Sequence, residues 1–161
     1  MEARVGVVTV SDSRSAGRQE DQSGPAAVEA LRAQGFCECE TRLVPDEISA
    51  IQRAIAELCE TCAAVFTTGG TGFSPRDVTP EATSTLLDRR ADNLVELMRL
   101  RGLEHTPMSH LSRGIAGVRG ATLVVNLPGS PKAVRQGLDA LAPLLPDLLS
   151  ALQGDGCGHG C

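Results

Sequence analysis

Short, continuous apolar runs constrain the fold of this chain more than any other feature. Residues 4–10 predict a strand of the kind that is buried on both faces, and residues 63–67 and 122–126 predict two more strands. Only 2% of the residues are aromatic, so the core must be built from Val, Leu, Ile and Ala. Strands and cores of this kind are typical of a parallel sheet covered by helices.

Segments with helical spacing of their apolar residues separate these strands. Ser23 and Asp46 stand where N-caps are expected, and Gly35 stands where a helix should end. The expected helices cover residues 23–34, 47–60, 80–89, 91–101 and 130–152, the last kinked at Pro143 and Pro146, and a further strand covers residues 37–44. Residues 102–120 have a mixed pattern that predicts no single element. The alternation predicts an α/β fold, a three-layer α/β/α sandwich with a mostly parallel sheet.

Composition argues against two classes of partner. The net charge of −5 and the lack of Trp and Tyr disfavour nucleic acid, which needs a basic face and stacking platforms. No segment approaches the ~20 apolar residues of a membrane helix, and the apolar N-terminal run is too short for a secretion signal. We therefore expect a cytoplasmic protein. Cys37, Cys39, Cys59 and Cys62 are expected to be reduced, buried side chains.

The densest chemical signal lies at residues 67–81, TTGGTGFSPRDVTPE. Glycines directly after a buried strand let the backbone approach a ligand and point N–H groups at it, which suits phosphate. The spacing matches neither G-x-G-x-x-G nor a Walker loop. A tight turn would also explain the glycines, but Arg76 and Asp77 add a cation and a carboxylate beside them. The predicted phosphate loop consists of Thr68, Gly69, Gly70, Thr71 and Gly72.

Two acids are expected at the carboxyl edge of neighbouring strands, where ligands bind in parallel sheets. Asp46 follows the strand at residues 37–44, and Asp77 follows the phosphate loop. Mg²⁺ typically uses one or two carboxylates together with substrate phosphates. The pair therefore predicts metal-assisted phosphoryl or nucleotidyl transfer. A helix cap and a solvated loop acid are the alternatives, and spacing alone does not decide between them.

A third loop lies at residues 126–132, NLPGSPK. A helix beginning at Ser130 would present free N–H groups to an anion. Lys132 could contact a phosphate or be an exposed first-turn lysine. Ser11, Asp12 and Arg14 follow the first strand and complete the rim, with capping or turn formation as the alternative for Ser11 and Asp12.

Together these motifs, in this order, resemble the molybdopterin adenylyltransferase family of MogA and MoaB type, which includes G-domains such as that of gephyrin. The resemblance covers about residues 4–152. Its most specific part is the GGTG…RDVTPE block, and LPGSPK is moderately specific. The matching blocks are residues 8–14, 44–47, 67–81, 111–113 and 127–132.

The resemblance implies a molybdopterin-binding fold and a homo-oligomer, a trimer or a hexamer. It implies an Mg²⁺-dependent reaction in which the terminal phosphate of molybdopterin attacks the α-phosphorus of ATP, giving adenylyl-molybdopterin and pyrophosphate. Asp46 and Asp77 match the catalytic acids, which would also hold Mg²⁺, and residues 69–72 match the nucleotide loop. The molybdate-insertion enzyme is a candidate partner. The candidate substrate contacts are Ser11, Asp12, Arg14, Pro128, Gly129, Ser130 and Lys132.

The chain departs from the family in two places. Asp92-Asn93 stands where many relatives have Pro-Gly before a Glu-x-Met-Arg helix, which should alter only a local turn. Residues 1–152 form the expected single domain, and residues 153–161 form a flexible tail. In that tail Cys157, His159 and Cys161 are candidate ligands for a thiophilic metal such as Zn²⁺ or Cu, although three adjacent ligands without a fourth make a weak site.

Two other functions fit the same fold. A non-catalytic molybdopterin-binding or scaffold protein could keep the fold without the activity, and the presence of both acids speaks against it. Competence-damage proteins, which hydrolyse pyrophosphate bonds, and molybdate-inserting enzymes share the fold. Both normally carry additional domains, for which 161 residues leave no room.

Overall fold

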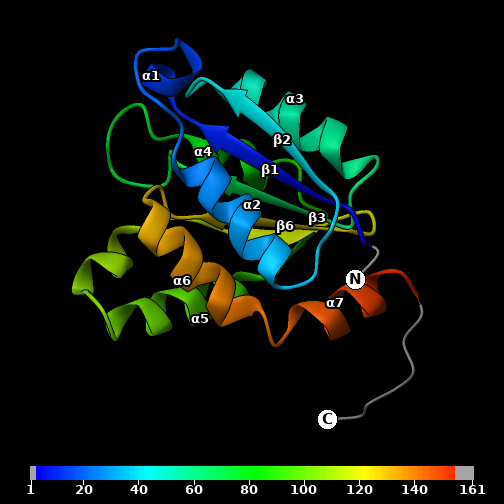
Figure 1. The fold of residues 1–161 in the computed structure, drawn as a ribbon. Helices are drawn as coiled ribbons and strands as arrows, with labels where there is room; N and C mark the ends of the chain where they lie inside the picture. Colours follow the sequence, from blue (N-terminus) through cyan, green and yellow to red (C-terminus); the bar gives the residue numbers. More distant parts are fainter. Residues whose placement is uncertain (1–2, 155–161) are drawn as a thin grey trace.

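A six-stranded sheet forms the centre of the computed structural model, which describes residues 3–154 (Figure 1). The strands are β1 (Val5–Val10), β2 (Cys39–Val44), β3 (Ala64–Thr68), β4 (Arg89–Arg90), β5 (Ala116–Arg119) and β6 (Thr122–Leu127). Their order across the sheet is β2-β1-β3-β6-β5-β4. Neighbours among β2, β1, β3 and β6 pair in parallel, whereas β5 is antiparallel to both β6 and β4. The sheet is therefore mostly parallel, as predicted.

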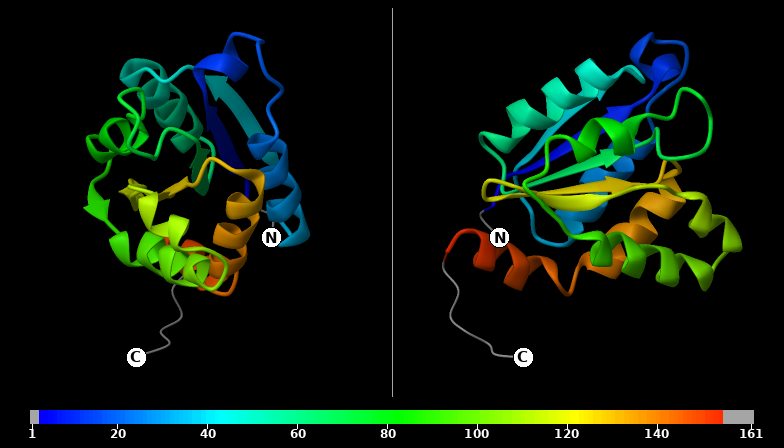
Figure 2. Two further views of the ribbon diagram at one scale, coloured as in Figure 1. Left: turned by 90° about the vertical axis from the view of Figure 1, so that its left-hand side faces the viewer. Right: turned by 180° about the vertical axis from the view of Figure 1, so that it is seen from behind.

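Helices cover both faces of the sheet (Figures 1 and 2). They are α1 (Asp12–Ser15), α2 (Ser23–Ala33), α3 (Ile48–Cys59), α4 (Thr79–Ser84), α5 (Asp92–Leu103), the 3₁₀ helix η1 (Pro107–Leu111), α6 (Pro131–Leu141) and α7 (Leu145–Leu152). The larger apolar core joins one face of the sheet to α2, α5, α6 and α7. The smaller core joins the other face to α3 and α4. The predicted three-layer α/β/α sandwich is confirmed.

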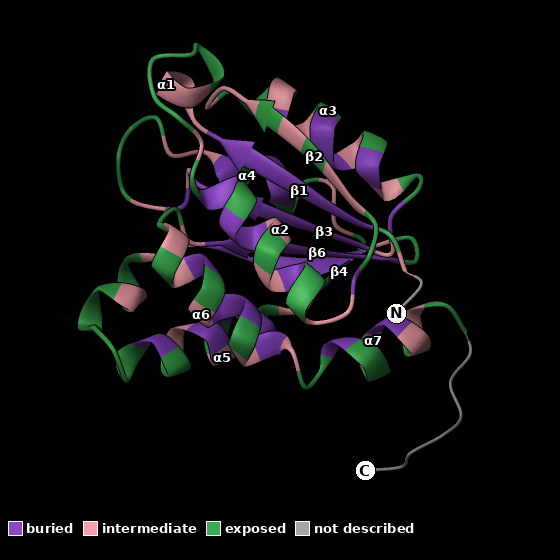
Figure 3. Ribbon diagram, in the orientation of Figure 1, coloured by how far each residue is buried: buried purple, intermediate pink, exposed green. Residues whose placement is uncertain are grey.

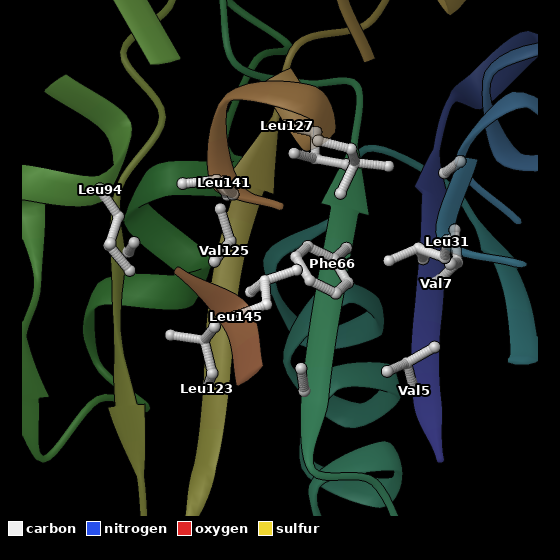
Figure 4. Packing of buried hydrophobic residues seen from close by; sticks show 14 of the residues in the cluster. Val5, Val7, Leu31, Phe66, Leu94, Leu123, Val125, Leu127, Leu141 and Leu145 are labelled. Carbon is white, nitrogen blue, oxygen red and sulfur yellow. The ribbon is translucent and has the colours of Figure 1, made fainter. Parts of the chain in front are cut away.

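The central strands are buried on both faces, which explains their largely apolar sequences without charged residues (Figure 3). Successive side chains of a strand point to opposite faces. Val5 and Val7 of β1 accordingly belong to the larger core, whereas Val8 and Val10 belong to the smaller one. Phe66 of β3 lies in the middle of the larger core, between β1 and β6 (Figure 4). With the core filled on both sides, the strand ends are left to build a site.

Some helix boundaries differ from the sequence-based predictions. Ser23 is the first residue of α2 rather than its N-cap, because the Asp21 carboxylate accepts the hydrogen bond from the Gly24 N–H at 3.0 Å. Asp46 is not the N-cap of α3; Glu47 occupies that position. The helix predicted over residues 80–89 spans only Thr79–Ser84, and Arg89–Arg90 pairs with β5 instead.

The four cysteines of the described residues are all free. Cys62 is buried as expected, but Cys37 is exposed. Burial raises the pKa of Cys59 to about 11, so its thiol stays protonated at neutral pH.

No helix between residues 3 and 154 is both long and apolar enough to cross a membrane. The candidate tail ligands Cys157, His159 and Cys161 lie outside the described residues.

Candidate active site

Four loops meet at the carboxyl edge of the parallel strands. They follow β1, β2, β3 and β6, and in Figure 1 they lie on the same side of the molecule as α1 and the first turn of α6. In parallel sheets this edge collects segments that are far apart in sequence. All four loops that carry the predicted site residues therefore reach one side of the molecule.

The loop after β3 has a backbone that only glycine adopts easily. Gly69 and Gly70 have φ angles of 95° and 67°. A Cβ atom on Gly69 would lie 2.3 Å from the Val10 carbonyl oxygen, and one on Gly70 would lie 2.3 Å from Thr79 Oγ1. The Thr79 hydroxyl donates to the Gly69 carbonyl at 2.9 Å, and its N–H donates to the Gly70 carbonyl at 3.0 Å. Thr79 thus holds the glycine turn through the carbonyl groups of Gly69 and Gly70. The side of the turn that faces away from Thr79 can face a ligand.

Asp12 and Asp46 bind each other through reciprocal hydrogen bonds. The Asp12 N–H donates to Asp46 Oδ2 and the Asp46 N–H donates to Asp12 Oδ1, both at 2.9 Å. Arg76 holds the Asp12 carboxylate with two further bonds, from Nε at 2.9 Å and from Nη2 at 3.0 Å. The loops after β1, β2 and β3 are therefore tied together by these three side chains.

The two linked acids have opposite pKa shifts. Hydrogen bonds from Arg76, together with the Asp46 backbone N–H, lower the pKa of Asp12. Burial raises the pKa of Asp46, and the nearby charges of Asp12 and Asp77 raise it further. Asp46 is thus a carboxylate whose negative charge is costly in this structure, a cost that a bound cation would remove.

Asp77 lies on the other side of the glycine loop. Its Oδ2 accepts a hydrogen bond from the Ser74 N–H at 3.0 Å, and a Cβ atom on Gly72 would lie 2.9 Å from the same oxygen. Within residues 3–154, Oδ1 of Asp77 and Oδ1 of Asp46 accept no hydrogen bond. Each acid thus keeps one oxygen available for a ligand.

A cavity of about 420 Å³ opens beside Asp77. The glycine loop and residues 128–130 form one side of it, and α5, η1 and α6 form the other. Its apolar lining comes from Val95, Met98, Met108 and Leu111. Pockets of this size with a few polar groups are typical small-molecule sites.

Asn126 contributes to the floor of this cavity and is itself buried. Its Oδ1 accepts from the Ile115 N–H at 3.1 Å, and its Nδ2 donates to the hydroxyls of Thr67 at 2.9 Å and Thr83 at 3.0 Å. These bonds join β6 to β3, to α4 and to the segment before β5. The amide therefore fixes the floor of the cavity relative to the sheet.

Comparison with known proteins bears directly on this site. The family described as "Probable molybdopterin binding domain" matches residues 6–147. The chain belongs to the molybdopterin-binding domain family. The molybdopterin adenylyltransferase of Helicobacter pylori strain J99 is 38% identical over 155 residues, which cover 94% of this chain and 88% of that protein. Gephyrin of Dictyostelium discoideum is 42% identical over 159 residues, covering 92% of this chain and 22% of gephyrin.

A solved structure gives the same result for the fold of this molybdopterin-binding domain. The crystal structure of the molybdopterin biosynthesis enzyme MoaB from Thermus thermophilus superposes with a TM-score of 0.89 at 49% identity. The match covers 94% of this chain and 97% of that one. The molybdopterin-binding fold predicted from the sequence is therefore confirmed.

The molybdopterin-binding domain brings most of the predicted site residues together. The predicted residues that line the cavity are Gly70, Thr71, Gly72, Asp77, Pro128, Gly129 and Ser130. Thr68 and Gly69 are buried behind the loop, where the Thr68 hydroxyl donates to the Pro128 carbonyl at 2.7 Å. Ser130 also caps α6, accepting from the Ala133 N–H at 3.2 Å.

Four of the predicted substrate contacts lie outside the cavity lining, namely Ser11, Asp12, Arg14 and Lys132. The Asp12 carboxylate is occupied by Arg76 and the Asp46 N–H. Ser11 is the N-cap of α1 and accepts from the Arg14 N–H at 3.2 Å, so it has the capping role that was its alternative. The Arg14 guanidinium points toward Ser23, at 3.4 Å from its hydroxyl. Lys132 is exposed in the first turn of α6. Direct contact of these side chains with a ligand stays a prediction.

Sequence reasoning missed the wall formed by α5 and η1. This wall comes from residues 102–120, where the pattern predicted no single element, together with the cavity-facing side of α5. Arg113 was noticed only as part of a matching block and was given no role. Its partners lie 32 to 41 positions away in the sequence, so no local signal could have identified them.

Proposed function

We propose that this protein adenylylates molybdopterin in molybdenum cofactor biosynthesis, with Mg-ATP as co-substrate. The observation that carries the proposal is the meeting of three features at one edge of the sheet. These are a glycine loop suited to phosphate, two acids each with an available oxygen, and a cavity with apolar walls. The name of the Helicobacter pylori relative, molybdopterin adenylyltransferase, supports the same activity.

In this proposal the two substrates occupy different parts of the site. The pterin enters the cavity, where Val95 and Met98 offer apolar contacts and Ser130 offers a hydroxyl. The triphosphate lies over residues 69–72, where the glycines have no side chain to keep an anion from the backbone N–H groups. The phosphate of molybdopterin then reaches the boundary between cavity and loop, beside Asp77.

Asp46 and Asp77 fit the needs of an Mg²⁺ ion. Residues 3–154 contain no group of three or more His, Cys, Asp or Glu side chains placed to hold a metal. A cation here would therefore take two carboxylate oxygens and complete its coordination with phosphates and water, as Mg²⁺ prefers. The raised pKa of Asp46 fits this assignment, because a cation would offset the repulsion from Asp12 and Asp77. Bound Mg²⁺ would supply neutralisation of phosphate charge.

The chemistry needs positioning more than it needs a base. The terminal phosphate of molybdopterin is already an anionic nucleophile. One of its oxygens forms a bond to the α-phosphorus of ATP while the bond from that phosphorus to the bridging β-phosphate oxygen breaks, and pyrophosphate leaves with the electron pair. The loop N–H groups and the oriented acids hold the reacting groups in line, which is the main source of acceleration in such transfers.

The test is pyrophosphate release from Mg-ATP by the purified protein, with and without molybdopterin. We expect release that requires molybdopterin and is lost in the double variant Asp46→Asn, Asp77→Asn. Asp139→Asn is a matched control, because Asp139 is exposed on α6 and away from the site. Molybdopterin binding without pyrophosphate release in the wild type would instead support a non-catalytic binding or scaffold protein.

We also propose that the protein acts as a cytoplasmic homo-oligomer, a trimer or a hexamer, that passes its product to a molybdate-insertion enzyme. The resemblance to the MogA and MoaB family supports this proposal. Light scattering after size-exclusion chromatography measures the mass in solution. A mass of about 16.8 kDa, that of one chain, would contradict it.

A further inference from the structure

Arg113 joins the two walls of the site. It lies between η1 and β5, and its backbone N–H is bonded directly to the glycine loop. Its neighbours Leu111 and Ser112 line the cavity, whereas its own side chain is bonded to the segment of residues 72–77. We call this segment the acid loop, because it begins beside the phosphate-binding turn and ends at Asp77.

The guanidinium binds both ends of the acid loop. Its Nε donates to the Gly72 carbonyl at 2.7 Å, and its Nη2 donates to the Asp77 carbonyl at 2.9 Å. The Arg113 N–H donates to the Thr71 carbonyl at 2.8 Å. One residue thereby sets the separation of the two ends of the loop and the position of the backbone that carries the Asp77 carboxylate.

Further contacts hold the guanidinium itself. Nη1 forms an ion pair with Glu81 of α4, and this contact lowers the pKa of Glu81. The ring of Phe73 packs on the guanidinium, with 5.7 Å between the ring centroid and Cζ. The Arg113 side chain is only 29% exposed, although Phe73 is 71% exposed. Glu81 and Phe73 therefore restrict the rotamers that Arg113 can adopt.

We propose that Arg113 is a positioning residue for the proposed transfer: it holds the acid loop so that the Asp77 carboxylate points at the reacting phosphates. This inference rests on the proposed function. The planar guanidinium of arginine can donate hydrogen bonds in several fixed directions at once, whereas the ammonium group of lysine is a single point charge. Lysine at this position could satisfy one carbonyl but not both, and the other would lose its donor.

The expected kinetic signature follows from the position of Arg113. Its side chain does not line the cavity, so molybdopterin should keep its contacts with α5 and α6. A displacement of Asp77 by about 1 Å would reduce the chemical step by roughly a hundredfold. Loss of Arg113 should therefore lower kcat and leave the KM for molybdopterin nearly unchanged.

The test compares Arg113→Lys and Arg113→Met with Arg135→Lys, a control in an exposed ion pair with Glu29. Turnover is measured by pyrophosphate release, and the order of the acid loop is measured separately by hydrogen exchange of its amides without substrates. We expect kcat to fall about 10- to 100-fold in both Arg113 variants. KM for molybdopterin should change less than about threefold, and exchange should be faster in residues 72–77.

Two outcomes would overturn the proposal. One is a lower melting temperature with wild-type kcat per folded molecule, which would make Arg113 merely structural. The other is an unchanged exchange rate in the acid loop. If the wild type itself shows no turnover, the proposed function has failed, and the hydrogen exchange still decides whether Arg113 orders the loop.

Discussion

The three acids of this site (Asp12, Asp46 and Asp77, here called the acidic rim) and its apolar cavity walls are built in different ways. In the rim, Asp12 and Asp46 are held by each other's backbone N–H groups at the ends of β1 and β2. In the cavity, Val95, Met98 and Met108 are apolar side chains placed by α5 and η1, which are joined to each other by the Ser109 hydroxyl and the Arg99 guanidinium. Rim geometry thus follows from the ends of the strands, whereas cavity shape follows from the helices that pack on one face of the sheet.

This difference separates two tasks that a transfer enzyme must perform. Charged groups must be fixed closely, because electrostatic stabilisation depends on distance and direction. A surface that binds a flat organic ring depends more on its area and shape than on the exact orientation of individual groups. Variants in the rim should therefore change the rate of the chemical step, and variants in the cavity should change substrate affinity.

The largest effect is expected for Asp77→Asn in the rim. Removing the charge should lower kcat by roughly a hundredfold or more while molybdopterin affinity stays within about threefold. Steady-state pyrophosphate release together with a separate binding titration measures both quantities. Turnover like that of the wild type would exclude Asp77 from the mechanism, and a large loss of affinity would break the division between rim and cavity.

Gly70→Ala tests the point where rim and cavity meet. An alanine at φ 67° is strained by about 1–3 kcal/mol, and its Cβ would press on Thr79 and approach Asp46 Oδ1 at 3.1 Å. We expect a lower free energy of unfolding in urea. Gly129→Ala is the control, because its Cβ would meet only ordinary contacts, the nearest being Gly69 Cα at 3.6 Å. Equal stability of the two variants would contradict the role given to the turn.

Ala133→Leu tests the cavity alone. Ala133 is half-buried on α6 and lines the cavity, so a larger side chain should exclude part of the pterin. We expect the KM for molybdopterin to rise about tenfold with kcat nearly unchanged. Ala151→Leu on the exposed side of α7 serves as the reference. A fall in kcat with normal KM would place the pterin elsewhere.

The smallest effect is expected for the stability of Asp46→Asn. Burial raises the pKa of Asp46 above its ordinary 3.8. The folded state therefore binds the Asp46 proton more tightly than the unfolded state does. Protonation of Asp46 stabilises the folded state fully at pH values below the pKa of Asp46 in the unfolded chain. This stabilisation is lost as the pH rises through the pKa of Asp46 in the folded protein. At pH 7 in EDTA the variant should therefore be more stable than the wild type, by less than about 1 kcal/mol.

Urea unfolding at several pH values measures this difference, which should shrink as the pH falls toward 4. Added Mg²⁺ should stabilise the wild type more than the variant. A variant less stable than the wild type at pH 7 would show that the carboxylate's hydrogen bond with Asp12 outweighs its burial.

The parts predicted from sequence are those that depend on nearby residues. The runs that became β1, β3 and β6 were recognisable because burial on both faces excludes charged residues and leaves only a few small polar ones. The glycine loop was recognisable because its turn admits no Cβ atom at positions 69 and 70. In both cases the constraint acts within a few residues of the chain.

The parts that were missed depend on contacts across the chain. β4 consists of two exposed arginines, and only its pairing with β5 makes it a strand. The cap-like position of Asp46 gave no sign of its bond with Asp12, which lies 34 positions earlier. The cavity wall from η1 exists only where that segment packs beside α5.

The buried Asn126 amide has a consequence for the choice of inhibitors. Both of its N–H donors are already engaged, with Thr67 and Thr83, so the cavity floor has no side-chain donor there to offer a guest molecule. Heterocycles chosen to accept a hydrogen bond at that depth would gain nothing from it. Compounds that combine a flat apolar body with an anionic group reaching the glycine loop should compete best with the natural substrate.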